Sequence, residues 1–221
     1  MRQLKKRLYT VSTLVPHGAR VADIGTDHGF LPIYLTGMGI SPYCIACDIK
    51  EKPLASAKEN IAKIGFTNIE ARLGNGLEPI LPNEVDCITI AGMGGEVISS
   101  ILDAAPWVKD KKYTLILQPM TSADSLRGYL CENGFTISRE LACEENHKVY
   151  TVMQATYSGE CFTPSELFRR IGMLKRSDGD TAANLYIEKQ IRILKELIDD
   201  RISAKLDTSE FEKVYAEMTA L

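Results

Sequence analysis

The sequence predicts an α/β fold built on a mostly parallel sheet of seven strands. Short apolar runs alternate with segments of helical periodicity as far as residue 131, and two last apolar runs flank a short polar turn near residue 145. Repeated β-α-β units form a parallel sheet with helices on both faces, whereas a short turn joins only antiparallel neighbours. The expected sheet is therefore parallel, with an antiparallel hairpin at its end.

The helices and strands of this sheet follow in order along the chain. A first helix is expected because Leu4, Leu8, Val11 and Val15 recur at helical spacing before Pro16. Pro53 lies in the first turn of the helix expected over 52–64. An N–H group at this position would have no partner within the helix, so its absence costs nothing. The expected strands cover residues 20–24, 43–49, 69–73, 85–91, 114–117, 137–143 and 149–157, and the other helices of this part include 30–35, 97–102 and 122–131.

The chain changes character at about Ser158, after which strand signals vanish. Apolar residues from Ile187 to Ile198 follow 4-3-4 spacing, which is typical of a helix with one buried side, and a further helix is expected from about Ser209. A helix over 181–206 would span roughly 39 Å at 1.5 Å per residue, which is long for a small domain. We therefore expect an α/β domain over residues 1–157 and a projecting C-terminal α-helical coiled-coil hairpin over residues 158–221.

The composition is that of an ordinary globular protein, with 45% hydrophobic and 25% charged residues. The net charge of −3 means that any contact with nucleic acid has to come from a local basic patch. No stretch has the pattern of a signal peptide or approaches the ~20 apolar residues of a membrane helix. A cytoplasmic protein with no membrane partner is expected.

Cys44 and Cys47 form a C-x-x-C pair, a spacing found in redox and zinc sites. They lie within an expected strand, on which residues three apart point to opposite faces of the sheet. No second cysteine pair and no cluster of histidines supplies further ligands. We therefore expect reduced core cysteines and no metal.

The strongest chemical signal is the turn after the first strand, VADIGTDHG at residues 21–29. Gly25 allows a tight turn and the close approach of a ligand, and Asp23 can accept a hydrogen bond from a cationic amino group. The spacing is G-x-x-x-G, and not the G-x-G-x-x-G that cradles a pyrophosphate. This combination suits S-adenosylmethionine, which carries an ammonium group and no phosphate. A plain glycine turn with Asp23 as a helix cap is the alternative.

Three further features follow later strands and are expected at the same edge of the sheet. Asp48 lies about 23 positions beyond Gly25, where an acidic residue holds ribose hydroxyls in nucleotide-binding folds; the alternative is a solvated carboxylate at a strand end. Asn75 can meet an adenine edge with a donor and an acceptor, although Gly-Asn and Asn-Gly pairs also simply form turns. The glycines of residues 92–95 leave bare backbone where ligands of open α/β folds bind.

With these residues, the chain resembles the bacterial tRNA (adenine-22) N1-methyltransferases, a class I S-adenosylmethionine-dependent family. The resemblance covers most of the chain, and the family's C-terminal coiled-coil domain matches the expected hairpin. The sequence departs from the family at Asn75, where the family usually has Asp, and at Met120, where it usually has Asn. The resemblance rests on KRL at residues 6–8, ADIGTDH at 22–28 with LP at 31–32, GNGL at 74–77, ITIAGMGG at 88–95 and LILQP at 115–119.

The resemblance implies a Rossmann-like class I methyltransferase fold, the cofactor S-adenosylmethionine and a tRNA substrate methylated at N1 of adenine 22. Asp27 is implied to lie near the target adenine and is the expected catalytic residue. Contacts with RNA are expected from Lys6, Arg7, Arg169 and Arg170. The expected cofactor-binding residues are Asp23, Gly25, Thr26, Gly29, Asp48, Ile49, Asn75, Gly76, Ala91, Gly92, Met93 and Gly94.

Other functions remain open at this point. A methyltransferase of the same fold can act on another RNA, a protein or a small molecule. A nicotinamide-dependent oxidoreductase is disfavoured by the missing pyrophosphate fingerprint and by the terminal hairpin. A non-catalytic RNA-binding module is disfavoured because Asp23, Asp27 and Asp48 are all present. The sequence does not indicate the oligomeric state.

Overall fold

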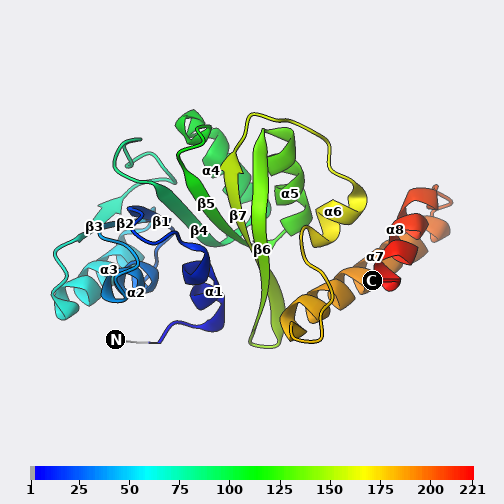
Figure 1. Cartoon of the computed structure of the whole chain (residues 1–221), viewed down its shortest axis with the longest axis horizontal. Coiled ribbons are helices and arrows are strands. Elements are labelled where there is room, and N and C mark those ends of the chain that lie inside the picture. Colours follow the sequence, from blue (N-terminus) through cyan, green and yellow to red (C-terminus); the bar gives the residue numbers. More distant parts are fainter. Residues whose placement is uncertain (1–2) are drawn as a thin grey trace.

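The structure of the protein is a computed structural model that describes residues 3–221. Seven strands form one sheet in the order β3-β2-β1-β4-β5-β7-β6 (Figure 1). The strands are β1 (Val21–Ile24), β2 (Cys44–Asp48), β3 (Ile69–Leu73), β4 (Cys87–Gly94), β5 (Thr114–Thr121), β6 (Phe135–Glu145) and β7 (Lys148–Tyr157).

The pairing of the strands confirms the predicted sheet. β1 pairs in parallel with both β2 and β4, β2 with β3, and β4 with β5, while β7 runs antiparallel to both β5 and β6. The chain moves outward from β1 to β3 and then crosses to β4 on the other side of β1. The strand order therefore reverses between β1 and β4, and ligands of open α/β sheets bind beside the carboxyl ends of the strands at such a point.

The fourth strand is longer than the sequence predicts. Its glycines were expected after the strand, but Met93 pairs with Pro119 and Gly94 pairs with Thr121, with irregular register on both sides of Met93. This irregularity is a β-bulge, which lets a strand bend and turn a side chain or a backbone group toward a ligand. β5 correspondingly continues to Thr121 instead of ending at residue 117.

Helices cover both faces of the sheet. α1 (Lys6–Leu14), α2 (Phe30–Gly37) and α3 (Glu51–Ile64) bury their apolar residues on one face, and α4 (Gly95–Asp103) and α5 (Ala123–Glu132) do so on the other. A short 3₁₀ helix, Pro106–Val108, follows α4. Cys44 packs in the apolar core on the side of α1 to α3, and Cys47 packs in the core on the side of α4 and α5. Both are free thiols. The C-x-x-C pair is therefore split between opposite faces, as predicted.

The C-terminal part is helical, as predicted, with α6 (Glu166–Ile171), α7 (Thr181–Ser203) and α8 (Ser209–Thr219). Figure 1 shows that α7 begins beside the β6–β7 hairpin and extends away from the sheet, and that α8 folds back along α7. The facing residues of α6, α7 and α8 form their own apolar cluster. α7 ends at Ser203, three residues early, because Lys205 takes a left-handed conformation and closes the helix. The division into domains at residue 157 stays a prediction.

No helix within residues 3–221 is both long enough and apolar enough to cross a membrane.

A fully buried ion pair fastens the C-terminal helices to the sheet. The guanidinium of Arg127 on α5 donates to Glu140 Oε1 on β6 at 2.7 Å, to the carbonyl oxygens of Arg169 and Arg170 on α6, and to Tyr186 Oη on α7 at 3.1 Å. Both charged side chains are completely shielded from solvent. Glu140 also accepts from the backbone N–H of Met173 and from the hydroxyl of Thr151. One pair of charges thus organises three helices and two strands.

Removing one member of this pair should destabilise the whole protein. Glu140→Leu leaves the Arg127 guanidinium buried and uncompensated, which typically costs about 3–5 kcal/mol. The double variant Arg127→Met with Glu140→Leu removes both charges and should lose less than the sum of the two single variants. Chemical unfolding of the wild type, Arg127→Met, Glu140→Leu and the double variant measures this. A single variant as stable as the wild type would contradict it.

Candidate functional site

A cavity of about 650 Å³ lies at the carboxyl ends of β1 to β4, beside the point where the strand order reverses. Its size is that of a site for a small ligand or cofactor. Of the residues expected to bind the cofactor, ten line the cavity together with Asp27: Asp23, Gly25, Thr26, Asp48, Ile49, Asn75, Gly76, Ala91, Gly92 and Met93. The loops after the first four strands therefore converge as the sequence predicts.

Two of the expected cofactor residues, Gly29 and Gly94, do not line the cavity. A side chain at Gly29 would meet Ala57 of α3 at 3.2 Å, so this glycine serves the packing of the turn against that helix. A side chain at Gly94 would meet the hydroxyl of Thr121 at 3.1 Å on β5. Both glycines permit close packing behind the cavity, which counts against a direct contact with a cofactor.

Asp23, next to last in β1, carries a carboxylate that is buried, at 4% exposure, yet borders the cavity. Thr26 Oγ1 donates to its Oδ2 at 2.7 Å, and Thr89 Oγ1 donates to its Oδ1 at 2.8 Å. Burial raises the pKa of Asp23 to about 6, although both hydroxyls lower it, and the nearby Asp48 adds to the rise. A cationic group placed in the cavity would stabilise the ionised carboxylate.

Gly25 follows with a φ of +74°, and a side chain at this position would overlap the methyl carbon of Met93. The turn therefore requires glycine for its backbone conformation and for the space above it. Asp27, two residues on, is held at a φ of +54°, which is uncommon for a residue with a side chain. Its carboxylate is 66% exposed and lies 3.7 Å from His28 Nε2.

Asp48 at the end of β2 fixes the loops on both of its sides. Its Oδ2 accepts from the backbone N–H of Asp27 at 3.1 Å, and its Oδ1 accepts from the backbone N–H of Lys50 at 2.9 Å. The side chain is 8% exposed and borders the cavity. The carboxylate predicted to hold a ribose thus also positions the predicted catalytic residue.

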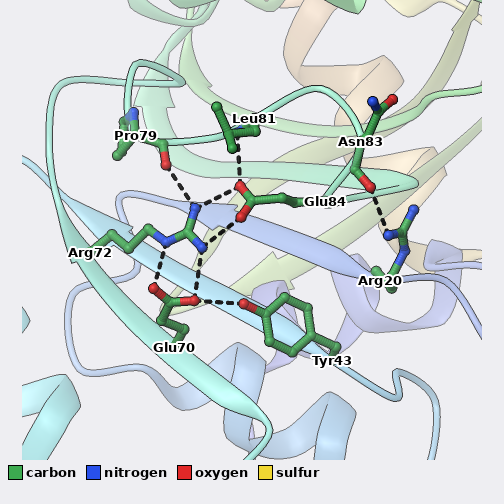
Figure 2. Close-up of polar contacts among 8 residues, drawn as sticks. All are labelled: Arg20, Tyr43, Glu70, Arg72, Pro79, Leu81, Asn83 and Glu84. Atoms are coloured by element: carbon green, nitrogen blue, oxygen red, sulfur yellow. Dashed lines mark hydrogen bonds and ion pairs between the residues drawn. The ribbon is translucent and has the colours of Figure 1, made fainter.

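The loop after β3 brings Asn75 and Gly76 to the cavity, and an arginine holds this loop in place. Arg72 pairs with Glu84 farther along the loop, through contacts of 2.7 and 2.9 Å, and donates to the carbonyl oxygen of Pro79 at 2.8 Å (Figure 2). Glu84 Oε2 in turn accepts from a backbone N–H within the same loop. The Asn75 turn therefore has a rigid support that the sequence did not indicate.

On the other side of Arg72 lies Glu70, which accepts from Arg72 Nε at 2.9 Å and Nη2 at 2.8 Å and from Tyr43 Oη at 2.7 Å (Figure 2). Hydrogen bonds from Arg72 and Tyr43 lower the pKa of Glu70 to about 2. Hydrogen bonds from Arg72 likewise lower the pKa of Glu84. One guanidinium therefore joins two carboxylates that both stay ionised at neutral pH.

The bulged end of β4, residues 91–94 (the Gly92 loop), is anchored by Gln118, a fully buried residue of β5. Its Oε1 accepts both from the backbone N–H of Gly92 at 3.0 Å and from Arg7 Nη1 at 2.7 Å. The Gly92 amide is therefore already engaged, and Gly92 contributes to the cavity through its small size. Met120, where the sequence departs from the family, lies outside this cavity.

An apolar wall of the cavity comes from α4 and was not predicted. Val97 and Ile101, one turn apart, line the cavity with Leu77 and the helix end at Ala104 and Ala105. Val97 is exposed although it is apolar, which is common where a ligand covers the surface. The four-residue spacing of Val97 and Ile101 places both on one side of a helix. The sequence alone does not distinguish a side that faces a ligand from one that faces the core.

Of the four residues expected to contact RNA, Arg7 lines the cavity and Lys6 lies exposed on the same helix, outside it. Arg170 is only 7% exposed and pairs with Glu166 at 2.7 Å. Arg169 forms an ion pair with Glu132 of α5. The burial of Arg170 and the engagement of Arg169 count against the RNA contacts expected for them, because Arg170 pairs within α6 and Arg169 ties α6 to α5.

Within residues 3–221, no three His, Cys, Asp or Glu side chains are grouped as metal ligands.

Gly25→Ala should weaken the binding of S-adenosylmethionine or its demethylated product by about tenfold or more. The added methyl group displaces Met93 into the cavity, and alanine resists the left-handed backbone. Gly39→Ala is the matched control, because Gly39 has a φ of +68° and open space around its side-chain position. Calorimetric titration should find normal affinity for Gly39→Ala only. Equal affinities in both variants would contradict this assignment.

Asp23→Asn should raise the stability of the cofactor-free protein and lower its affinity for the cofactor. A buried acid with a raised pKa binds its proton more tightly in the folded state, so its contribution to stability falls as pH rises from about 4 to about 6. Without cofactor, the variant should therefore be more stable than the wild type at pH 8, by about 1–3 kcal/mol. Its affinity for S-adenosylmethionine should be lower.

The pH dependence of cofactor affinity provides the second measurement for Asp23. Wild-type affinity should decline as pH falls through about 6, where Asp23 takes up its proton. Asp23→Asn should lack this decline. A wild-type affinity as flat as that of the variant between pH 8 and pH 5 would show that the Asp23 charge does not act on the cofactor.

Comparisons with known proteins agree with this geometry. Residues 4–153 match a family described as a methyltransferase domain. The chain is 43% identical over 157 residues to the tRNA (adenine(22)-N(1))-methyltransferase of Bacillus subtilis, a match that covers 69% of this chain and 65% of that protein. The aligned part thus spans just under two thirds of that relative's length.

Solved structures resemble the whole chain. The crystal structure of the B. subtilis m1A22 tRNA methyltransferase TrmK is 32% identical, with a TM-score of 0.80, and the likeness covers 99% of this chain and 95% of that one. The Streptococcus pneumoniae protein Sp1610, solved in complex with S-adenosyl-L-methionine, is 30% identical, with a TM-score of 0.84, over 98% of this chain and 99% of that one. The chain therefore belongs to the methyltransferase-domain family and, within it, to the group of tRNA (adenine(22)-N(1))-methyltransferases.

Proposed function

We propose that this protein transfers a methyl group from S-adenosylmethionine to N1 of adenine 22 in tRNA. The observation that carries the proposal is the convergence of Asp23, Asp27 and Asp48 on one cavity at the reversal of the strand order. Family membership supplies the class of reaction, and the carboxylates supply groups suited to both reactants. Since tRNA is the proposed substrate, we expect the protein to act in the cytoplasm.

The residues of the cavity fit the cofactor. Asp23 suits its ammonium group, Asp48 its ribose hydroxyls and Asn75 the edge of its adenine. The apolar wall with Val97 and Ile101 suits the flat face of the adenine ring. When bound, S-adenosylmethionine supplies an electrophilic methyl group on a positively charged sulfur.

The replacement of the family's usual Asp by Asn75 leaves an acceptor for the exocyclic amine of the cofactor's adenine. The carboxamide oxygen can accept that hydrogen bond, and the carboxamide nitrogen can donate to a ring nitrogen. Asn75 Nδ2 lies 3.3 Å from Glu78 Oε1, which also borders the cavity. A negative charge therefore remains next to this turn although position 75 is neutral.

Asp27 is placed to orient the acceptor base. Ring N1 of adenine already carries a lone pair, so the protein has mainly to hold it in line with the methyl group. The exposed carboxylate of Asp27 can accept a hydrogen bond from the exocyclic amine of the target adenine and favour the positive charge that develops on the ring. The base has to leave its stack in the tRNA to reach this position.

Two other functions make different predictions. A methyltransferase for another RNA, a protein or a small molecule would keep the cofactor half of the cavity but would not require adenine 22. A non-catalytic RNA-binding module would bind tRNA without consuming the cofactor. Incubation with labelled S-adenosylmethionine and tRNA, followed by nucleoside mapping, separates these cases. Label at N1 of adenine 22, lost when that base is changed to guanine, would support the proposal, and label elsewhere or none would refute it.

Asp27→Asn should slow methyl transfer by on the order of tenfold to a hundredfold, with little change in cofactor affinity. The amide keeps the size and backbone position of Asp27 but loses the charge that favours the positive ring. Single-turnover rates together with calorimetry measure the two effects. Lys63→Met, on the exposed surface of α3, is the control for loss of one charge. A near wild-type rate in Asp27→Asn would rule out this role.

A further inference from the structure

The charges that line the cavity are separated between its two sides. Its carboxylates, Asp23, Asp27, Asp48 and Glu78, all come from β1, β2 and the loops that follow β1 and β3. Arg7 enters from α1, a helix that contacts β4, β5, β6 and β7. The other lysine or arginine of the lining, Lys50, directly follows Asp48 on the acidic side. A cationic cofactor is therefore drawn to the β1–β3 side, and an anionic group to the Arg7 side.

Arg7 is held firmly in this place. Its Nη1 donates to Gln118 Oε1 at 2.7 Å, its backbone N–H donates to Glu145 Oε2 at 3.1 Å, and its Nε lies 3.7 Å from Glu145 Oε1. The Arg7 side chain is 19% exposed. Its Nη2 donates to no group within residues 3–221, so one edge of the guanidinium has donors left for a ligand.

Gln118 connects Arg7 to the Gly92 loop at the bulged end of β4. The same Oε1 atom accepts from Arg7 and from the Gly92 amide, while Nε2 donates to the carbonyl oxygen of Pro119 at 2.8 Å. The carboxamide is fully buried, so its orientation is set by these three bonds. A change in Gln118 would therefore release the guanidinium and the Gly92 loop together.

We propose that Arg7 binds a backbone phosphate of the RNA next to the acceptor nucleotide, and that Gln118 is the positioning residue that aims Arg7 and holds the Gly92 loop. The proposal deepens the proposed function and rests on it, because it concerns the tRNA side of the same cavity. A guanidinium with one edge fixed by protein groups presents its other edge to a phosphate with little loss of rotational freedom. The acceptor base is thereby placed between Asp27 and the Gly92 loop.

The test compares Arg7→Met, Arg7→Lys, Gln118→Met and the double Met variant with the wild type. Arg7→Met should raise the KM for tRNA by about tenfold and reduce the slope of log KM against log salt by about one. Affinity for S-adenosylmethionine should stay within about twofold, since the carboxylates are untouched. Arg7→Lys should restore the salt dependence in part, because it keeps the charge but loses the fork.

Gln118→Met keeps the size of the side chain but has no acceptor for Arg7 or Gly92. It should raise the KM for tRNA and lower kcat. The double variant should be less impaired than the sum of the two single effects, because the two residues act as one unit. Arg139→Met, which removes an exposed arginine from β6, is the matched control and should behave as the wild type. If Gln118→Met does not fold, the two Arg7 variants decide the outcome alone.

The results distinguish the failure of this proposal from the failure of the proposed function. If the wild type does not methylate tRNA, the proposed function is wrong and the phosphate contact falls with it. If the wild type methylates tRNA and Arg7→Met keeps the same KM and the same salt slope, only the role of Arg7 is refuted. A loss of cofactor affinity in Arg7→Met equal to the change in tRNA KM would also refute it.

Discussion

The buried carboxylate of Asp23 is the constraint on which the arrangement of the cavity depends. A charge at the end of a central strand is unfavourable unless other groups compensate it, and here the hydroxyls of Thr26 and Thr89 do so in part. Thr26 belongs to the glycine turn and Thr89 to the adjacent strand β4. The glycine turn and the strand that carries the Gly92 loop are thus both tied to one carboxylate. The remaining compensation is left to a cationic ligand.

The sequence was sufficient for the sheet and for most of the cavity, because both follow from local patterns. Apolar runs and turn residues predicted the parallel order and the final hairpin, and the residues after each strand converge because the carboxyl ends of parallel strands share an edge. The extension of β4 through Gly92 to Gly94 was missed because a bulge depends on pairing with β5, which is distant in the sequence. The cofactor contacts of Gly29 and Gly94 stay predictions, because in a sequence a glycine required by packing looks the same as one required by a cofactor.

The supports of the site were beyond prediction because they join distant segments. Arg72 and Glu84 are separated by a loop, Arg7 and Gln118 by four strands, and no spacing in the sequence relates them. The same holds for the burial of Arg170, which the sequence presents as one of two adjacent basic residues. Two adjacent basic residues suggested a surface for RNA, whereas Arg169 pairs with Glu132 of α5 and Arg170 pairs with Glu166 within α6.

The β6–β7 hairpin contacts both the cavity residue Arg7 and the C-terminal helices. Near its tip, Glu145 contacts Arg7 at the cavity, while Ala142 and Val149 pack against the start of α7. Both contacts lie near the tip, where Glu144 pairs with Val149, so this end of the hairpin joins the cavity to the helical arm formed by α7 and α8. An insertion or deletion in these two strands would shift both contacts at once, so relatives that keep the same arm are expected to keep the same number of residues between Phe135 and Tyr157.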